Sequence, residues 1–411
     1  MRQSDDSAND YLADGFGASG VLCKRLNAAQ QREEALRTAL LMFALPLLMW
    51  SPGALTADAT ANSGSTPVPA MTVPLSGYLT PRAKEVIITH DAWDLNGFTS
   101  PNGDPNAQVE SRDLQASCAA HSKQIIEGRL NKQYPATIEH KTIGGVPTDV
   151  VTPKSGIAER NRNRVLINMH GGGFIGKCPD GLVEAMPIAG TGRIKVITVD
   201  YREAPETKFP AASEDVTAVY RELLKSYAPE NIGLYGCSAG GVLAGQATAW
   251  IITHQLPRPG AIGVFCAGLA DWGGDSMYTA RFLPSNPTTG IMHLMTYTKD
   301  IDTTDPTLYP ASHLDLLAKF PPVLFVTATR DMAMSDAIYS HNQLAKAGVE
   351  SDLRVWDGLG HAFILDDLPE AKDANNIIVH FFDEHLGRKA LKSIPPGCPS
   401  ARLCSGRPTS G

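Results

Sequence analysis

The sequence has no long run of lysine and arginine, and its 36 basic side chains are outnumbered by 43 acidic ones, for a formal net charge of -7. Nucleic-acid-binding proteins usually carry a basic patch, so we expect no nucleic-acid partner. The sequence also has no Cys-x-x-Cys and no His-Glu-x-x-His. These spacings are typical of zinc sites, so we expect no metal and no other cofactor. A small-molecule substrate is the better starting hypothesis.

No apolar run reaches the roughly 20 residues that a membrane-spanning helix needs. The run near the N-terminus, Ala39–Trp50, follows Arg32 and is followed by Ala57-Asp58-Ala59. A short apolar core between basic residues and an Ala-x-Ala site is typical of a signal peptide. We therefore expect a leader over residues 1–59, cleaved near Ala59, and a secreted or periplasmic protein. The alternative is a hydrophobic N-terminal arm that is retained.

The segments on either side of the central region are low in complexity. Residues 60–76 are rich in Ser, Thr, Pro and Ala and predict a flexible linker, and residues 388–411 predict a surface or disordered tail. Residues 77–387 then form one folded domain. Cys398 and Cys404, in a Pro/Gly-rich segment, are the favoured disulfide pair, although the sequence leaves the connectivity open.

Strand and helix patterns alternate from about residue 136 onward. This alternation predicts an α/β fold with a mostly parallel central sheet and helices on both faces, and ligands of such sheets bind at the carboxyl ends of the strands. The predicted strands are Arg164–Met169, Ile194–Val199, Ile232–Tyr235, Ala261–Phe265, Val323–Thr327 and Leu353–Trp356, and the predicted helices are Ser213–Tyr227, Gly241–Gln255, Ser335–Gly348 and Lys372–Leu386.

Two stretches interrupt this alternation. Residues about 77–135 include a helical pattern over Gln108–Gln133, and residues about 271–307 carry scattered large apolar side chains. Both are too long for simple loops. We predict that together they form a helical cap over the carboxyl edge of the sheet; the alternative is a peripheral decoration without a role at the site.

A Gly-x-Ser-x-Gly sequence, Gly236–Gly240, lies directly between a predicted strand and a predicted helix. Such a tight turn forces strained backbone angles on the serine and leaves no room for a Cβ at its flanking positions, hence the glycines. Ser238 is therefore the candidate nucleophile. Cys237 is expected to be a packed residue behind the turn and not a second nucleophile.

The segment His170–Phe174 follows another strand and contains three consecutive glycines. Glycines leave their N–H groups accessible, as an oxyanion hole for acyl transfer requires. We predict that Gly171 and Gly172 donate two N–H groups to the oxyanion and that Ala239 donates a third.

A serine nucleophile needs a histidine base and a carboxylate that orients the histidine. Asp331 and His361 each follow a predicted strand, in that order after Ser238, and so are expected at the same edge of the sheet. Asp336 is the alternative acid, but it lies within a helix pattern.

Together, these motifs resemble those of the hormone-sensitive-lipase-like (bacterial family IV) esterases of the α/β-hydrolase superfamily. The resemblance covers about residues 135–387 and rests on His170–Phe174, Asp200–Glu206 with Phe209–Ala212, Gly236–Gly241 and Gly360–Phe363. It implies serine-dependent hydrolysis of short or compact carboxylic esters beneath a helical cap. In this family Asp200–Glu206 is thought to form a structural ion-pair and turn network.

Two features depart from the usual family pattern. Cys237 replaces the common Asp in the turn, and Asp331 is not followed by Pro-Leu. Both variants resemble members that hydrolyse lactones, so a lactone is the alternative substrate; a non-catalytic small-molecule-binding protein is a further alternative. The sequence leaves monomer and homodimer open. The expected pocket is apolar and includes Phe174, Trp272, Phe282 and Met292.

Overall fold

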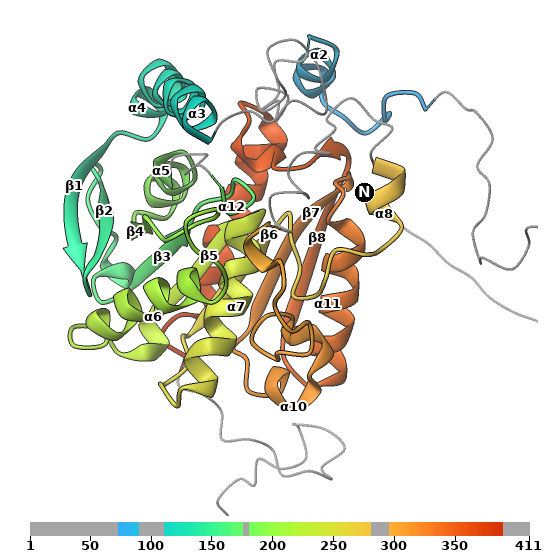
Figure 1. Cartoon of the computed structure of the whole chain (residues 1–411). Coiled ribbons are helices and arrows are strands. Elements are labelled where there is room, and N and C mark those ends of the chain that lie inside the picture. Colours follow the sequence, from blue (N-terminus) through green and yellow to red (C-terminus); the bar gives the residue numbers. More distant parts are fainter. Residues whose placement is uncertain (1–72, 90–110, 176–180, 281–295, 389–411) are drawn as a thin grey trace, which may run out of the picture. The chain divides into compact units, whose positions relative to one another are not determined.

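Figure 1 shows the computed structural model of the chain, which describes residues 73–89, 111–175, 181–280 and 296–388. Its contacts divide the chain into two units, Met1–Val73 and Pro74–Gly411. Every helix and strand described below belongs to the second unit. The predicted leader, most of the linker, the tail and the Cys398–Cys404 pair lie outside the described residues.

An eight-stranded sheet forms the centre of the second unit, in the order β1-β2-β4-β3-β5-β6-β7-β8. β1 pairs antiparallel with β2, and β2 antiparallel with β4, whereas all pairs from β4 to β8 are parallel. The strands are β1 Ala136–Ile143, β2 Val146–Pro153, β3 Val165–Met169, β4 Lys195–Val199, β5 Ile232–Cys237, β6 Ala261–Phe265, β7 Val323–Arg330 and β8 Ser351–Gly360. The six predicted strands are thus confirmed as β3 to β8.

The β1–β2 hairpin was missed in the sequence because β1 lies at the edge of the sheet and exposes most of its side chains. Its turn is Gly144-Gly145, and both glycines have positive φ, 62° and 87°. Two such residues between short strands are the usual signal for a tight hairpin. That signal was present in the sequence, but the polar β1 pattern hid it.

Helices cover both faces of the sheet (Figure 1). On one face α6 Ala211–Leu223, α7 Ala239–Thr253 and α11 Met334–Lys346 pack into one apolar core, and on the other α5 Gly181–Gly192 and α12 Pro369–His385 pack into a second. The interior of β3 serves both cores, because Val165 and Ile167 point into the first and Leu166 into the second. This alternation is the period-two pattern of a strand buried on both faces.

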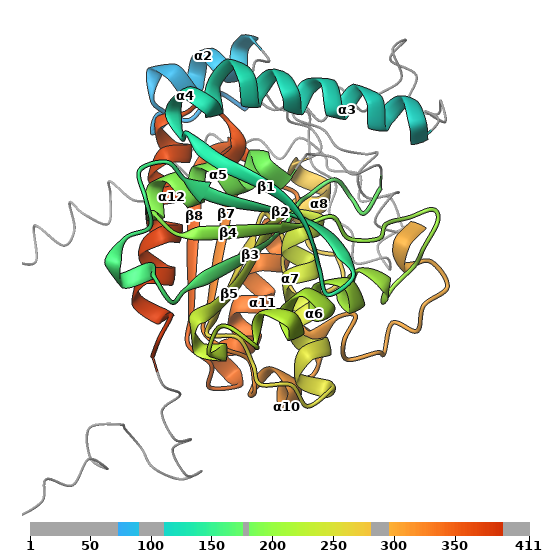
Figure 2. The ribbon, with the colours of Figure 1, turned by 90° about the vertical axis from the view of Figure 1, so that its left-hand side faces the viewer.

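The segment before β1 is helical. α2 Pro81–Thr89 is followed by α3 Ser111–Ile125, which continues through a π-helical turn, η3 Ile126–Leu130, into α4 Asn131–Gln133; Figure 2 shows α2, α3 and α4 in one view. The Thr80 N–H, just before α2, donates to Glu370 at the start of α12 (2.8 Å), and Arg129 donates to the Leu365 carbonyl (2.6 Å). The segment is thereby attached close to the turn after His361.

The second interrupting stretch contains α8 Ser276–Thr279 within its described part. Residues 90–110 and 281–295 lie outside the described residues, so the cap that we predicted from the two stretches together stays a prediction.

The last linker residues contact the folded domain, since Pro74 accepts a hydrogen bond from Arg330 (2.8 Å) and Ser76 contacts Asp357. In the described part of the chain, no helix combines the length and apolar character needed to cross a bilayer. The remaining short helices are η4 Glu159–Asn161, η5 Pro229–Asn231, η7 Pro310–Ser312, α10 Leu314–Leu317 and η8 Phe363–Leu365.

Candidate active site

Ser238 stands in the tight turn between β5 and α7, with φ 57° and ψ -122°. This backbone conformation is strained for any residue with a Cβ. The flanking glycines are required by space: a Cβ on Gly236 would lie 2.2 Å from the Met169 carbonyl oxygen, and one on Gly240 would lie 1.9 Å from the same atom. The turn therefore packs directly against the end of β3, where the glycine-rich segment begins.

The structure brings Ser238, His361 and Asp331 together in one hydrogen-bonded chain. The Ser238 Oγ lies 2.9 Å from His361 Nε2, and His361 Nδ1 lies 2.7 Å from Asp331 Oδ1. The side chains of His361 and Asp331 are buried, whereas Ser238 is partly exposed. A bound carbonyl compound can thus reach the serine, while the carboxylate behind the imidazole stays shielded from water.

The surroundings of Asp331 favour its ionised form. Burial raises its pKa, but the facing His361 and hydrogen bonds from His361, the Ala333 N–H (2.9 Å) and Thr327 Oγ1 (2.8 Å) together lower the pKa below its usual value. The alternative acid, Asp336, instead contacts Ser340 Oγ (3.1 Å) and the Ala270 N–H (3.2 Å). Asp331, the candidate acid at the end of a strand, is therefore the carboxylate that bonds to His361.

The glycine turn differs from the prediction at its first donor. The Gly171 N–H donates to Glu184 Oε1 at 2.8 Å, so it already has a strong acceptor, and its assignment to the oxyanion hole is wrong. Gly172 and Gly173 have φ of 105° and 67°. Among the described residues we find no acceptor for the N–H groups of Gly172, Gly173 and Ala239. In the described part of the glycine turn and of the turn that carries Ser238, these three N–H groups are therefore available as donors.

Of the four predicted pocket residues, two are described. Phe174 is fully buried and stacks on Tyr297 with ring centroids 4.3 Å apart, so it belongs to the core beneath the glycine turn and its prediction as a pocket wall is wrong. Trp272 is half-buried, and its ring lies edge-on to His361 at a centroid distance of 6.1 Å. It borders the candidate site. Phe282 and Met292 lie outside the described residues.

Comparisons with known proteins show the family to which the chain belongs. A family model described as the alpha/beta hydrolase fold matches residues 166–365. An acetyl-hydrolase of Streptomyces hygroscopicus is 30% identical over 232 residues, which cover 54% of this chain and 77% of the relative. The crystal structure of an esterase from the bacterial hormone-sensitive lipase family has a TM-score of 0.64 and 26% identity, covering 75% of this chain and 99% of that one. This chain belongs to the hormone-sensitive-lipase-like esterases of the α/β-hydrolase superfamily.

A further relative of this α/β-hydrolase is the carboxylesterase/phospholipase LipF of Mycobacterium tuberculosis, which is 29% identical over 248 residues. The match covers 56% of this chain and 65% of LipF, so the chain spans just under two thirds of that relative's length.

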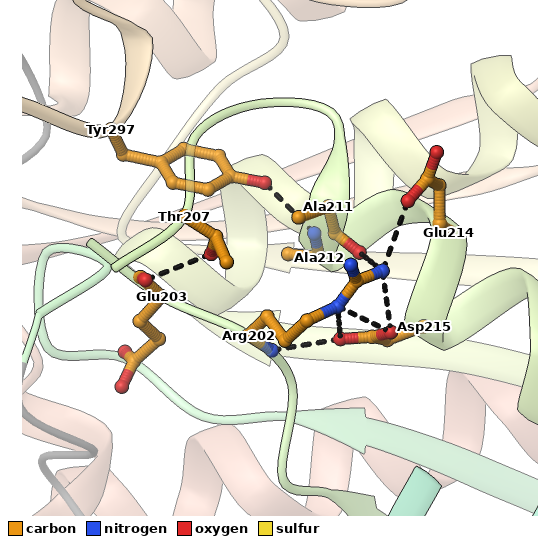
Figure 3. Close-up of polar contacts among 8 residues, drawn as sticks. All are labelled: Arg202, Glu203, Thr207, Ala211, Ala212, Glu214, Asp215 and Tyr297. Carbon is orange, nitrogen blue, oxygen red and sulfur yellow. Dashed lines mark hydrogen bonds and ion pairs between the residues drawn. The ribbon is translucent and has the colours of Figure 1, made fainter. Parts of the chain in front are cut away.

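The Asp200–Glu206 segment of this α/β-hydrolase forms a network of polar contacts with the start of α6 (Figure 3). Arg202 Nε donates to Asp215 Oδ1 (2.9 Å), and the Arg202 N–H donates to Asp215 Oδ2 (2.8 Å). A second guanidinium nitrogen reaches Glu214 and the Ala211 carbonyl. The Tyr297 hydroxyl accepts the Ala212 N–H (2.9 Å). The predicted structural role of this segment agrees with these contacts.

We expect Asp215→Asn to destabilise the fold by about 1–3 kcal/mol, because the Arg202 groups lose a buried charged acceptor. The change leaves Ser238 and its partners in place, so kcat and KM for an ester should stay within about threefold of wild type. Urea unfolding and steady-state kinetics measure the two effects. Unchanged stability, or a tenfold loss of kcat, would contradict this assignment.

Among the residues that the structure describes, one group of side chains has ligand atoms close enough for a metal ion: those of Cys266, Asp331 and His361 lie within 4.8 Å of one another. The last two already bond each other, and Cys266 Sγ accepts the Ala362 N–H at 3.3 Å. The hydrogen bond that the Cys266 thiol donates to Cys237, and then burial, raise the pKa of Cys266. A protonated thiol is a poor metal ligand, so this cluster is better suited to hydrogen bonding.

A buried carboxylate, Glu184, was missed in the sequence. It is 4% exposed, in the first turn of α5, and accepts hydrogen bonds from the Gly171 N–H (2.8 Å), the Cys237 N–H (3.2 Å) and Asn168 Nδ2 (3.0 Å). The only hint in the sequence is a charged residue within an otherwise apolar stretch, Leu182–Ala189. Its partners are 13 and 53 residues away from it, so they could be found only in the fold.

Burial raises the pKa of Glu184 from 4.5 to about 7, against the lowering effect of its hydrogen bonds. Between pH 4.5 and 7 the folded state thus holds a proton that the unfolded state releases. The contribution of this group to the stability is complete below pH 4.5 and is lost as the pH rises through 7. We expect the difference in melting temperature, wild type minus Glu184→Gln, to decrease as the pH rises from 4.5 to 8.

The neighbouring titratable groups do not account for such a change, because burial raises the pKa of Tyr201 and Tyr235 well above 10 and the pKa of Cys237 is also raised. Melting curves of both proteins across this pH range provide the measurement. A difference in melting temperature between wild type and Glu184→Gln that stays constant or grows with pH would contradict this prediction.

Proposed function

We propose that the protein hydrolyses carboxylic esters through an acyl-enzyme on Ser238. The observation that carries the proposal is the hydrogen-bonded chain from Ser238 through His361 to Asp331, with distances of 2.9 and 2.7 Å. A hydroxyl, an imidazole and a shielded carboxylate in this order are the parts that nucleophilic acyl transfer needs. Family membership and the names of the relatives support the same activity.

In the proposed reaction His361 Nε2 takes the Ser238 proton while Oγ forms a bond to the ester carbonyl carbon. Asp331 keeps the imidazole oriented and stabilises its positive charge. The tetrahedral anion collapses as the bond to the alcohol oxygen breaks, and His361 gives its proton to that oxygen. Water then attacks the acyl group with His361 again as base, which releases the acid and restores Ser238.

The oxyanion in this reaction would bind to the N–H groups of Gly172, Gly173 and Ala239. Support comes from the close packing of Met169 and His170, just before the glycines, against the turn that carries Ser238, and from the absence of another acceptor for these N–H groups among the described residues. Ala239 is also the first residue of α7, where the helix dipole favours negative charge. Preorganised donors of this kind stabilise the transition state without reorganisation during the reaction.

The proposed substrates are compact esters with short acyl groups. One relative is named an acetyl-hydrolase, and Trp272 offers an apolar surface beside His361. Lactones are the alternative substrates, and the presence of Cys237 in the turn that carries Ser238 favours them. A ring ester needs the same nucleophile and base, and its alcohol stays attached to the released acid.

A panel of p-nitrophenyl esters from C2 to C12, aliphatic lactones and anilides, measured on wild type and on Ser238→Ala, tests this proposal. We expect the highest kcat/KM for C2 to C4 esters. A higher kcat/KM for lactones would replace the ester by a lactone substrate. Saturable binding without turnover of any compound would instead support the binding-protein alternative and reject hydrolysis.

We also propose that the protein is exported, with the leader cleaved near Ala59. The apolar run Ala39–Trp50 before Ala57-Asp58-Ala59 supports this, as does the disulfide at Cys118, because disulfides persist in oxidising compartments. N-terminal sequencing of the mature protein should begin near Thr60. A mature chain that still begins at Met1 would reject the proposal.

A further inference from the structure

We propose that Glu184 is a positioning residue for the oxyanion hole. It holds the glycine turn, His170–Phe174, and the nucleophile turn, Gly236–Gly240, at a fixed position relative to each other. The inference rests on the proposed ester hydrolysis, since it assigns a role within that reaction. Glu184 touches none of the reacting groups. It acts through the two backbone segments that carry the proposed donors and the nucleophile.

The carboxylate joins these segments at the residues directly before their functional groups. Glu184 Oε1 accepts the Gly171 N–H, and the next two amides, of Gly172 and Gly173, have no acceptor within the described part of the chain. Glu184 Oε2 accepts the Cys237 N–H, and the next residue is Ser238. One side chain thus fixes both sides of the space in which a tetrahedral intermediate would form.

The other backbone hydrogen bonds of the glycine turn go to its carbonyl groups and not to its glycine N–H groups: Gly172 accepts the Ile175 N–H (3.2 Å) and Phe174 accepts the Ala204 N–H (2.8 Å). Gly172 and Gly173 both have positive φ and carry no side chain that could pack. On its other side the turn is held by the Tyr201 hydroxyl, which donates to the His170 carbonyl at 2.6 Å. The Glu184 contact therefore supplies the hydrogen bond that fixes the Gly171 amide at the entrance to the turn.

The chemistry at this position requires a group that only accepts. Three donors converge on the carboxylate: two backbone N–H groups and Asn168 Nδ2. Above its pKa of about 7 the Glu184 side chain is an ionised carboxylate with free lone pairs for all three donors, so the comparison with glutamine is made at pH 8 or higher. A glutamine has the same shape, but its amide nitrogen would face at least one of these donors. Glu184→Gln therefore disturbs the contact with little change of volume.

The test compares wild type, Glu184→Gln and Glu184→Asp with Asp215→Asn as matched control. Asp215 is also a buried carboxylate that accepts a backbone N–H, but from Arg202. For each protein, kcat and KM for p-nitrophenyl acetate are measured per active site titrated with a fluorophosphonate. Amide hydrogen exchange of a peptide that spans the glycine turn is followed by mass spectrometry.

For Glu184→Gln we expect a loss of about 10²-fold in kcat with KM within about twofold, because a misplaced oxyanion donor weakens binding of the transition state alone. Exchange in the glycine turn should be about fivefold faster or more, since the Gly171 amide loses its acceptor. Glu184→Asp keeps the charge on a shorter side chain, so its kcat and its exchange rate should lie between those of wild type and Glu184→Gln. The Asp215→Asn control should match wild type in both measurements.

The inference is overturned by unchanged kcat per titrated site in Glu184→Gln, or by a slower enzyme whose glycine turn exchanges as in wild type. An equal loss of kcat in Asp215→Asn would also overturn it, because the effect would then be general to buried carboxylates. If wild type hydrolyses no ester or lactone, the proposed function fails on its own. The exchange measurement then still decides whether Glu184 holds the turn.

Discussion

Replacing Ser238 by alanine should lower kcat for p-nitrophenyl acetate by about 10⁶-fold, the scale found when a serine protease loses its nucleophile. The change removes the single oxygen that lies 2.9 Å from His361 Nε2. The backbone of the turn is held independently of that oxygen, because the Ser238 N–H donates to the Phe265 carbonyl (2.8 Å). The variant should therefore fold normally, bind substrate with little change, and keep only the residual hydrolysis that the oxyanion donors and substrate binding support.

Two further measurements separate loss of the nucleophile from loss of the fold. Wild type should gain one fluorophosphonate adduct by intact mass, with release of fluoride, and Ser238→Ala should gain none. Cys237→Ala is the matched control, because it removes the neighbouring nucleophilic side chain, which is buried behind the turn. It should keep at least a tenth of the wild-type kcat. Wild-type turnover by Ser238→Ala would refute the proposed mechanism.

Replacing Asp331 by asparagine should lower kcat by about 10⁴-fold with a small effect on KM. The carboxylate lies 2.7 Å from His361 Nδ1, and its lowered pKa keeps it charged at neutral pH. An asparagine cannot stabilise the imidazolium, and its amide group can turn the histidine to the wrong tautomer. The measurement is steady-state hydrolysis, together with a melting curve to verify the fold.

Asp336→Asn provides the matched control for this change. Asp336 is also buried and close in sequence, but burial raises its pKa well above the usual value and so favours its neutral form. An amide in its place keeps that neutrality, and kcat should remain within about threefold of wild type. If Asp336→Asn loses as much activity as Asp331→Asn, the carboxylate that orients His361 has been misassigned.

Much of the fold could be predicted because it follows from local patterns. Buried parallel strands such as Ala261–Phe265 are short apolar runs, and that strand has the predicted bounds. The nucleophile turn was predictable for a similar reason. Its strained serine and the lack of room for a Cβ at Gly236 and Gly240 restrict which residues can occupy it.

The errors at the site share one cause. Gly171 and Gly172 look alike in the sequence, but the N–H of Gly171 points toward Glu184 on α5, and that direction depends on a residue 13 positions away. Phe174 was predicted to line the apolar pocket, whereas its positive φ of 60° accompanies a ring that packs inward on Tyr297. Neither direction is encoded in the spacing of residue types.

The amino-acid order was therefore sufficient for the α/β class, the position of the nucleophile and the order of serine, acid and histidine, because each depends on a repeat, a steric demand or a strand end. Only the tertiary structure decided that Asp331 and not Asp336 meets His361, which amides remain free, and that Glu184 joins the two turns. Hydrogen bonds are directional and short, so their partners are chosen by how distant segments are packed together.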